Sequence, residues 1–239
     1  MFNQAIRWEI MDKNPNLKAN KPKKIRTEKC FYDLNQVKKL LDVLDNESLK
    51  NKALIVLALD SGARRSEICA LRWSDIDFDT RMMSITKPLK VVEGVVDEKT
   101  TKTESSIRTI KLSESTINLL KEYKEWQEAY KKVYKRRWTG KDNRIFTSVD
   151  GGYMHPSTCD HIIRKIVRKY NLDHISFHEL RHTCASLLIN SGIDPKTVSK
   201  RLGHADTSIT MEIYTHVFQE SKNACADKFD DMMKKLENA

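Results

Sequence analysis

The sequence predicts a mainly helical protein with a small antiparallel β-sheet, an α+β fold. Apolar residues recur at helical spacing between Leu34 and Leu44, which is typical of an amphipathic helix. Residues 82–112 lose this period and carry short β-branched runs, which favour short strands. From residue 113 onward the pattern is again helical, and we expect helices to the end of the chain.

The N-terminal part predicts one short helix followed by a linker. Residues 1–12 form the helix, and Asn14-Pro15 ends it. Residues 18–29 are basic and contain Pro22, which favours an extended chain. Because an isolated helix has nothing to pack on, we expect it to be the tail of a preceding domain.

Three helices are expected before the strands. Leu34 to Leu44 forms the first, and an apolar run near residues 49–59 forms a buried second one. Ser61-Gly62 breaks that helix, and Arg64 to Leu71 resumes it. Two or three short strands are then expected, on the evidence of the β-branched runs at Met83–Ile85, Val91–Val92, Val95–Val96 and Ile107–Ile110.

The C-terminal third has clear helix boundaries. Asp194-Pro195 supplies an N-cap and a first-turn proline, and Gly203 ends the same helix. A following helix, from Thr207 or Ser208, would carry Tyr214. An amphipathic helix is expected over residues 218–237.

The segment 119–138 carries aromatic residues at spacings of three and four, which indicate one buried helical stripe. Its members are Tyr123, Trp126, Tyr130, Tyr134 and Trp138. The neighbouring lysines would then lie on the solvent side, where some could touch phosphate.

Composition points to a polyanionic partner. The net charge is +10 and the isoelectric point is about 9.3, which favours nucleic acid over a membrane surface. The five cysteines are scattered, without a C-x-x-C pair, as in reduced proteins. With no signal peptide and no long apolar run, we expect a cytoplasmic protein.

The stretch "SFHELRHTCASLL" contains His178-Glu179-Leu180-Arg181-His182, which matches the H-E-x-x-H zinc signature of metalloproteases. Two obstacles weigh against zinc. A third ligand would have to come from Glu212 or His204, and Arg181 places a fixed cation beside the metal.

An alternative is that this helix holds a phosphate. His178 and Arg181 lie at i and i+3, on one face, and offer guanidinium donors beside a titratable imidazole. Arg64 is a second guanidinium at a helix N-terminus, where anions are favoured, and Glu67 could orient it.

Four blocks of sequence together resemble the tyrosine recombinase (lambda-integrase) family. They are "SGARRSEICALRWSDID", "TKTESSIRTI", "FHELRHTCASLL" and "LGHADTSITMEIYTH". The resemblance covers about residues 30–218 and implies the catalytic-domain fold of that family. It assigns residues 1–24 to the tail of an upstream core-binding domain plus linker, and residues 25–239 to the catalytic domain.

The resemblance also implies a chemical role for each matching residue. Arg64, Arg181 and His204 would bind the scissile phosphate, with Glu67 supporting. Tyr214 would attack that phosphate and form a 3′-phosphotyrosyl intermediate.

Protons would be handled by two further residues. Lys102 would protonate the leaving 5′ oxygen, and His178 would move the proton of the tyrosine. No metal, ATP or other cofactor is implied. Lys99 competes with Lys102 for the acid role, and Arg65 neighbours Arg64.

The resemblance implies a DNA-integrating or recombining enzyme of a phage or mobile element. Its partners would be double-stranded DNA attachment sites, three further copies in a tetramer and an accessory excision factor. In relatives such a C-terminal helix packs on a neighbouring protomer, and the alternative is that it packs on its own core. The alternatives are an Xer-type resolvase, a DNA-binding protein without chemistry, and the zinc peptidase.

Overall fold

The computed structural model describes residues 2–18, 31–86, 89–92, 95–98, 107–203, 210–211, 213–215 and 234. Its α-helices are α1 (Phe2–Arg7), α2 (Leu34–Leu44), α3 (Leu49–Ser61), α4 (Arg65–Ala70), α5 (Glu114–Tyr134), α6 (Pro156–Lys169), α7 (Phe177–Asn190) and α8 (Pro195–Leu202). The strands are β1 (Ile76–Asp77), β2 (Met82–Ile85), β3 (Leu89–Val92), β4 (Val95–Glu98) and β5 (Arg108–Lys111). Short 3-10 turns are η1 (Pro15–Lys18), η2 (Trp73–Asp75) and η4 (Lys135–Arg137).

Helix ends follow local capping chemistry. At the start of α2, Asp33 accepts from the backbone N–H of Gln36 (2.8 Å), and the Gln36 side chain accepts from the backbone N–H of Asp33 (2.9 Å). Gly62 ends α3 in a left-handed conformation, with φ of 60°. Asp194 and Gly203 start and end α8, so the predicted bounds of this helix are confirmed.

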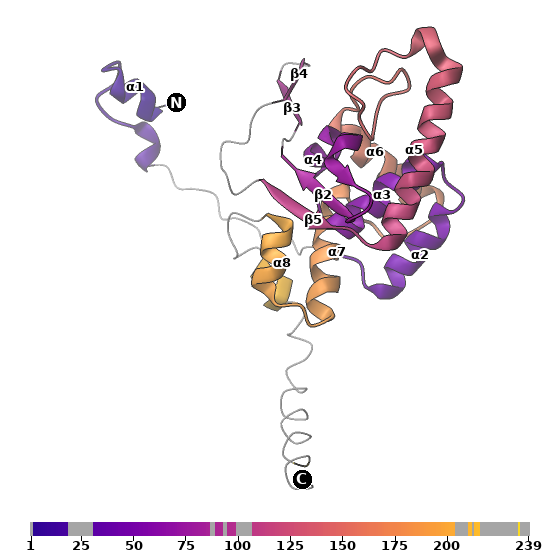
Figure 1. Cartoon of the computed structure of the whole chain (residues 1–239). Coiled ribbons are helices and arrows are strands. Elements are labelled where there is room, and N and C mark those ends of the chain that lie inside the picture. Colours follow the sequence, from indigo (N-terminus) through magenta and orange to yellow (C-terminus); the bar gives the residue numbers. More distant parts are fainter. Residues whose placement is uncertain are drawn as a thin grey trace.

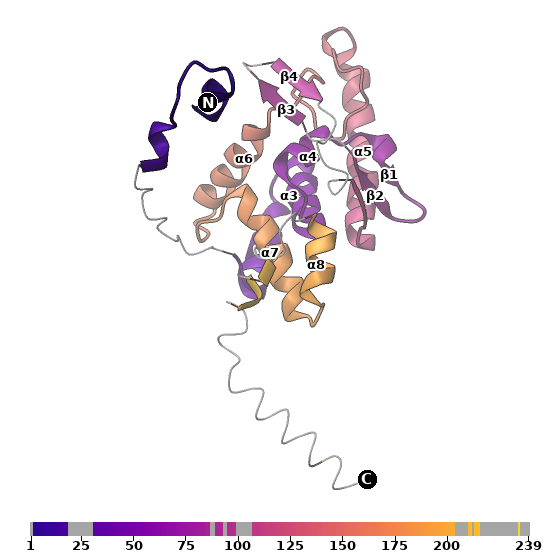
Figure 2. The ribbon, with the colours of Figure 1, turned by 90° about the vertical axis from the view of Figure 1, so that its left-hand side faces the viewer.

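Helix α3 is the centre of the core. It contacts α7 on one side and α5 on another, and Figures 1 and 2 show it enclosed by the surrounding helices. Leu54 and Leu57 are fully buried, because apolar residues occupy every side of this helix rather than one stripe.

The small antiparallel sheet that the sequence predicts is confirmed. Its strand order is β1-β2-β5, and Met83 lies opposite Ile110, so both apolar side chains enter the core. A separate hairpin pairs β3 with β4, with Val91 opposite Val96. Strand β1 is an addition that the sequence did not suggest.

The prediction of one buried aromatic stripe on α5 is wrong beyond its first turns. Tyr123 is buried, whereas Trp126 keeps 41% of its surface exposed. The helix projects beyond the core, as Figure 1 shows, so the later rings stack on one another instead. Successive ring centroids from Tyr123 through Trp126 and Tyr130 to Tyr134 lie 5.8, 5.1 and 4.2 Å apart.

The prediction that the chain after residue 112 consists of helices is also wrong in one segment. Residues 138–155 form an irregular segment held by isolated bridges, between Arg72 and Arg144 and between Thr147 and Tyr153. Gly140, Gly151 and Gly152 within it are turn signals that a helical interpretation passes over.

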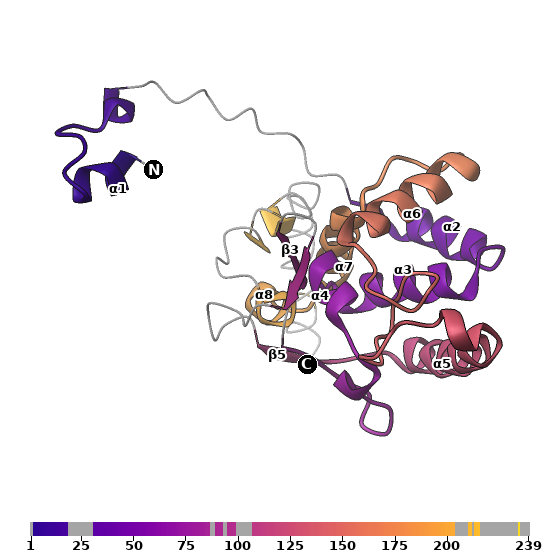
Figure 3. The same ribbon diagram turned by 90° about the horizontal axis from the view of Figure 1, so that it is seen from above.

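Helix α1 lies apart from the helical body in Figures 1 to 3. Its side chains are not buried, and Trp8 just after it is 65% exposed. The predicted linker after Lys18 and nearly all of the predicted helix 218–237 lie outside the described residues. In the part of the chain that is described, no helix has the length and apolar character needed to span a membrane.

Candidate active site

Arg64 sits at the N-terminus of α4, as the sequence predicts, and is held by Glu67. Its Nη1 donates to Glu67 Oε1 (2.8 Å), and its backbone N–H donates to Oε2 of the same carboxylate (2.8 Å). Its Nη2 donates to the carbonyl of Gly203 at the end of α8 (2.8 Å). The side chain remains 37% exposed, so a ligand can still reach this oriented guanidinium.

Arg181 is almost completely buried on α7. Its Nη1 donates to the carbonyl of Gly62, two residues before Arg64 (2.7 Å). Burial first, and then the positive charge of Arg64, lowers the pKa of Arg181 to about 9. The guanidinium is therefore still charged at neutral pH, and an approaching anion would offset the cost of keeping two cations together.

His178 lies one turn before Arg181 on the same helix. Burial, followed by the charges of Arg181, Arg64 and Arg65, holds the pKa of His178 below its ordinary value, while Glu179 partly opposes this. The imidazole is consequently neutral at pH 7 and able to accept a proton.

Glu179 has a structural role that the zinc interpretation does not provide for. Its side chain accepts from the backbone N–H of Ser176, and its own N–H donates to Ser176 Oγ (3.4 Å), forming a capping box at the start of α7. His178 and His182 pack edge to face, with ring centroids 4.8 Å apart. Within the described ranges, no group of three or more His, Cys, Asp or Glu residues could hold a metal; Glu212 and His204 lie outside them.

Tyr214 lies on a helical segment that packs against α7 and α8. Thr210, Met211 and residues 213–215 are helical, as predicted for the chain that follows Gly203. Ile213 is buried and Tyr214 partly buried against an apolar cluster, which also contains Cys184, Ala185, Ile189, Val198 and Leu202. The tyrosine is thus anchored to the helix that carries His178 and Arg181.

The sequence profile of the Phage integrase family matches residues 31–221, which include every element described above except α1 and η1. The chain belongs to the phage integrase family.

Curated relatives within the family have different names. A "Tyrosine recombinase XerC-like" protein of Caldanaerobacter subterraneus is 32% identical over 97% of this chain and 63% of its own length. The ICEBs1 integrase of Bacillus subtilis is 30% identical over 98% of this chain and 63% of its own length. The chain therefore spans a little under two thirds of these two relatives.

Solved structures of integrases have a fold similar to that of this chain. The Tn1549 transposon integrase in complex with circular intermediate DNA superposes with a TM-score of 0.75 at 23% identity, covering 95% of this chain and 76% of that one. A lambda integrase dimer bound to a core site gives a TM-score of 0.59 at 18% identity, covering 89% of this chain and 68% of that one. At these identities the likeness establishes the shared fold.

The structure brings together some, but not all, of the predicted site residues of this integrase-family chain. Arg64, Glu67, His178 and Arg181 are gathered at the junction of α4, α7 and α8, and Tyr214 packs against α7 and α8. Lys102, its competitor Lys99, and His204 lie outside the described residues. Arg65 forms an ion pair with Asp160 of α6, and its charge also contributes to the lowered pKa of His178.

Arg108 is a member of this cluster that the sequence analysis did not single out. It is the first residue of β5, its side chain is only 7% exposed, and it forms a two-point ion pair with Glu67. The sequence signal that could have identified Arg108 was its position in "TKTESSIRTI", the block that also contains Lys102, the predicted general acid.

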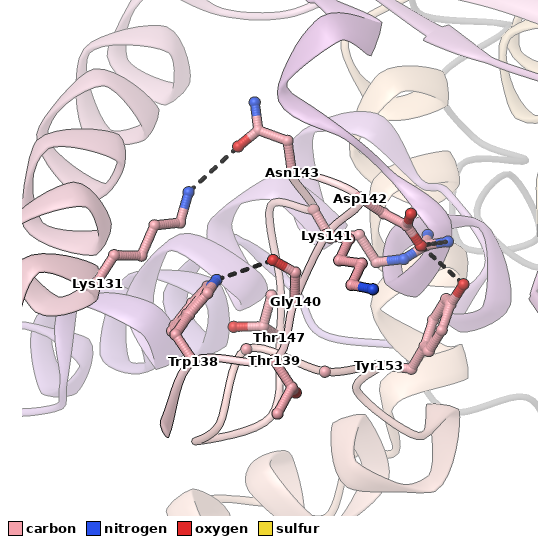
Figure 4. Close-up of a pocket in the computed structure, with 12 residues that line it drawn as sticks. Lys131, Trp138, Thr139, Gly140, Lys141, Asp142, Asn143, Thr147 and Tyr153 are labelled. Carbon is pink, nitrogen blue, oxygen red and sulfur yellow. Dashed lines mark hydrogen bonds and ion pairs between the residues drawn. The ribbon is translucent and has the colours of Figure 1, made fainter. Parts of the chain in front are cut away.

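A separate cleft lies at the far end of α5, among residues that were not predicted to form a site. Its volume is about 610 Å³, and Figure 4 shows Lys131, Trp138 and Tyr153 around it. Tyr153 donates to Asp142 Oδ2 (2.7 Å), and the Trp138 indole donates to the Gly140 carbonyl (3.1 Å). These contacts are made within the segment itself and bring none of the predicted catalytic residues to the cleft.

Proposed function

We propose that this chain is the catalytic part of a site-specific DNA recombinase that cleaves and rejoins DNA through a 3′-phosphotyrosyl intermediate at Tyr214. The observation that carries the proposal is the convergence of Arg64, Arg181 and a neutral His178 at one junction, with the tyrosine's helix packed on α7. Membership of the phage integrase family, with relatives named recombinase and integrase, supports the proposal.

The electrostatics of the cluster suit a phosphodiester. Arg64 and Arg108 share the carboxylate of Glu67, and Arg181 lies near enough to be influenced by the same charge. Since these guanidiniums outnumber that carboxylate, the site carries a surplus of positive charge. Arg64 and Arg181 would bind non-bridging oxygens and stabilise the negative charge that grows in the transition state.

The chemical steps follow from the roles assigned above. The Tyr214 oxygen attacks phosphorus while neutral His178 takes the phenolic proton. The bond to the 5′ oxygen breaks, and Lys102 gives that oxygen a proton, with His204 as a further hydrogen-bond donor to the phosphate. A 5′-hydroxyl of the partner duplex then displaces the tyrosine and restores a phosphodiester, so no external energy source is consumed.

The proposed context is integration or excision of a phage or mobile element, in a tetramer on double-stranded attachment sites in the cytoplasm. Residues 1–24 would belong to an upstream DNA-clamping domain and its linker. The relatives include both an element-encoded integrase and XerC-like recombinases, so a chromosome-resolving role remains the alternative.

The proposal is tested with a nicked suicide duplex carrying the end sequence of the parent element, incubated with the protein in excess EDTA. A protein–DNA band that survives a denaturing gel is expected for the unsubstituted chain and for Tyr153→Phe, a tyrosine 41% exposed in the cleft. Tyr214→Phe should abolish this band while DNA binding persists.

Other outcomes select the other functions. Binding without any covalent product would identify a DNA-binding protein without chemistry. A product that Tyr214→Phe leaves intact would overturn the assignment of the nucleophile. A product that forms without EDTA but is lost in its presence would indicate a metal-dependent enzyme.

A further inference from the structure

We propose that Arg108 is a positioning residue of this active site, which fixes Arg64 through Glu67 and holds the last turn of α8 against both. The inference rests on the proposed function, since positioning has meaning only for a reaction. The contacts of Arg108 with Glu67 and with the end of α8 place it beside the reacting groups, and it need not touch the DNA itself.

The first contact is a fork of hydrogen bonds to Glu67. Arg108 Nη1 donates to Oε1 (3.1 Å) and Nη2 to Oε2 (2.8 Å). Arg64 uses the same two oxygens, through Nη1 and its backbone N–H. Each oxygen of one carboxylate therefore bridges two arginines, and its position depends on both.

The lowered pKa of Glu67 shows that Arg108 helps to keep this buried carboxylate charged. Burial would raise the pKa of the Glu67 carboxyl, but the hydrogen bonds and charge of Arg108, with those of Arg64, hold the pKa below its ordinary value. Without Arg108, the buried carboxylate would draw more strongly on Arg64 or take up a proton. Either change would alter the direction in which Arg64 presents its guanidinium.

The second contact is with the end of α8. Arg108 Nε donates to the carbonyl of Arg201 (3.0 Å), next to the Arg64 bond to the Gly203 carbonyl. These carbonyls belong to a helix C-terminus, where a positive charge is favourable. The chain that leaves this turn leads to Tyr214.

Gly203 shows how closely the turn lies on Arg108. A Cβ atom at this position would lie 2.9 Å from Arg108 Nη1 and 3.1 Å from its Cζ, and the backbone φ is 68°. Glycine permits both the left-handed turn and the approach. Arg108 thus links β5, α4 and the turn that precedes the nucleophile's helix.

Arg201 provides a matched control, because it secures the same turn through different groups. Its Nη1 donates to the carbonyl of Lys111 (3.0 Å), and its Nη2 donates to the carbonyl of Asp60 (2.9 Å) and to Asp60 Oδ1 (3.1 Å). If Arg108 only docked α8, substitution of Arg108 and substitution of Arg201 should slow cleavage to the same extent. If Arg108 is a positioning residue, its substitution should slow cleavage more than that of Arg201.

The experiment compares Arg108→Lys with Arg201→Lys in single-turnover cleavage of the suicide duplex, DNA affinity and urea unfolding. Lysine keeps the charge beside Glu67 but loses the fork. For Arg108→Lys we expect cleavage to slow by about 10- to 100-fold, the scale of a misplaced catalytic group, with unchanged DNA affinity. Arg201→Lys should cleave like the unsubstituted chain, even if both variants unfold at similarly lowered urea concentrations.

A double-variant cycle tests the route through Glu67. If Arg108 acts by way of this carboxylate, Glu67→Gln combined with Arg108→Lys should cleave no more slowly than the slower single variant. Glu67→Gln combined with Arg201→Lys should show independent effects.

Each outcome bears on a different claim. Equal slowing in both lysine variants, in proportion to lost stability, would overturn the positioning role alone. Additive effects of Arg108→Lys and Glu67→Gln would also overturn it. Absence of the Tyr214-dependent product in the unsubstituted chain would overturn the proposed function, and the inference with it.

Discussion

Two basic regions of this molecule are built in opposite ways. At the junction of α4, α7 and α8, Arg64, Arg108 and Arg181 are oriented by a carboxylate and by backbone carbonyls. At the far end of α5, Lys132 and Arg136 are exposed beside a ladder of aromatic rings. Charge alone therefore does not mark a site; charge held in a fixed direction does, because only fixed groups act without reorganisation.

The largest contrast concerns the aromatic residues of α5. Tyr123 is buried between Phe146 and Trp73, whose ring centroids lie 5.6 and 5.9 Å away, whereas Tyr134 is stacked near the helix end. Tyr123→Ala should lower the free energy of unfolding by about 3–5 kcal/mol, as for other buried aromatics, and Tyr134→Ala by much less. Urea unfolding of the two variants checks this, and equal losses would mean that the ladder is part of the core.

The next largest effect is expected on the cleavage rate, from substitution of the buried Arg181. Arg181→Lys cannot keep the fixed guanidinium geometry, so the single-turnover cleavage rate should fall about 10²- to 10³-fold, the cost of losing one oriented donor. DNA affinity, measured by gel shift, should change far less. A variant that cleaves normally would show that Arg181 serves only the packing of α7.

A smaller effect is expected from pH. Burial lowers the pKa of His178 in the folded state, and so do the charges of Arg181, Arg64 and Arg65, while Glu179 partly opposes this shift. As pH falls, the unfolded chain therefore takes up the His178 proton at a higher pH than the folded chain does. The folded state should therefore lose stability as pH drops below about 6.5. His178→Asn should flatten this dependence in urea unfolding between pH 7.5 and 5; an unchanged slope would contradict the shift.

The smallest effect is expected at the end of α5. Lys132→Gln combined with Arg136→Gln removes two exposed charges that the structure places outside the arginine cluster. Unfolding and cleavage at saturating DNA should both remain unchanged. Slower cleavage at saturation would show that this region is also functional, and would end the contrast between the two regions.

Local sequence signals predict much of this molecule because the chemistry of those positions is itself local. Gly62 and Asp194-Pro195 determine helix ends through caps and φ angles that depend on near neighbours. The resemblance predicts site residues through spacing, and the structure gathers three of these predicted residues, Arg64, His178 and Arg181, at one junction.

Long-range geometry limits what the sequence could predict. The α5 stripe has the same period whether it meets a core or projects past it, so Trp126 was assigned to the interior. Arg108 is distant in sequence from Glu67, and only the paired strands of the sheet bring it there. The cleft arises from an irregular segment that carries no periodic pattern.

Helix α4 joins the two regions. It is six residues long, about 9 Å at the usual rise per residue, and begins directly after Arg64. At its other end, the carbonyl of Ala70 accepts a hydrogen bond of 2.6 Å from Arg144, which lines the cleft and stacks over Tyr153. Arg64 and Arg144 are thus fixed to opposite ends of one short helix, so we expect a displacement of Arg144 to shift the backbone on which Arg64 is mounted.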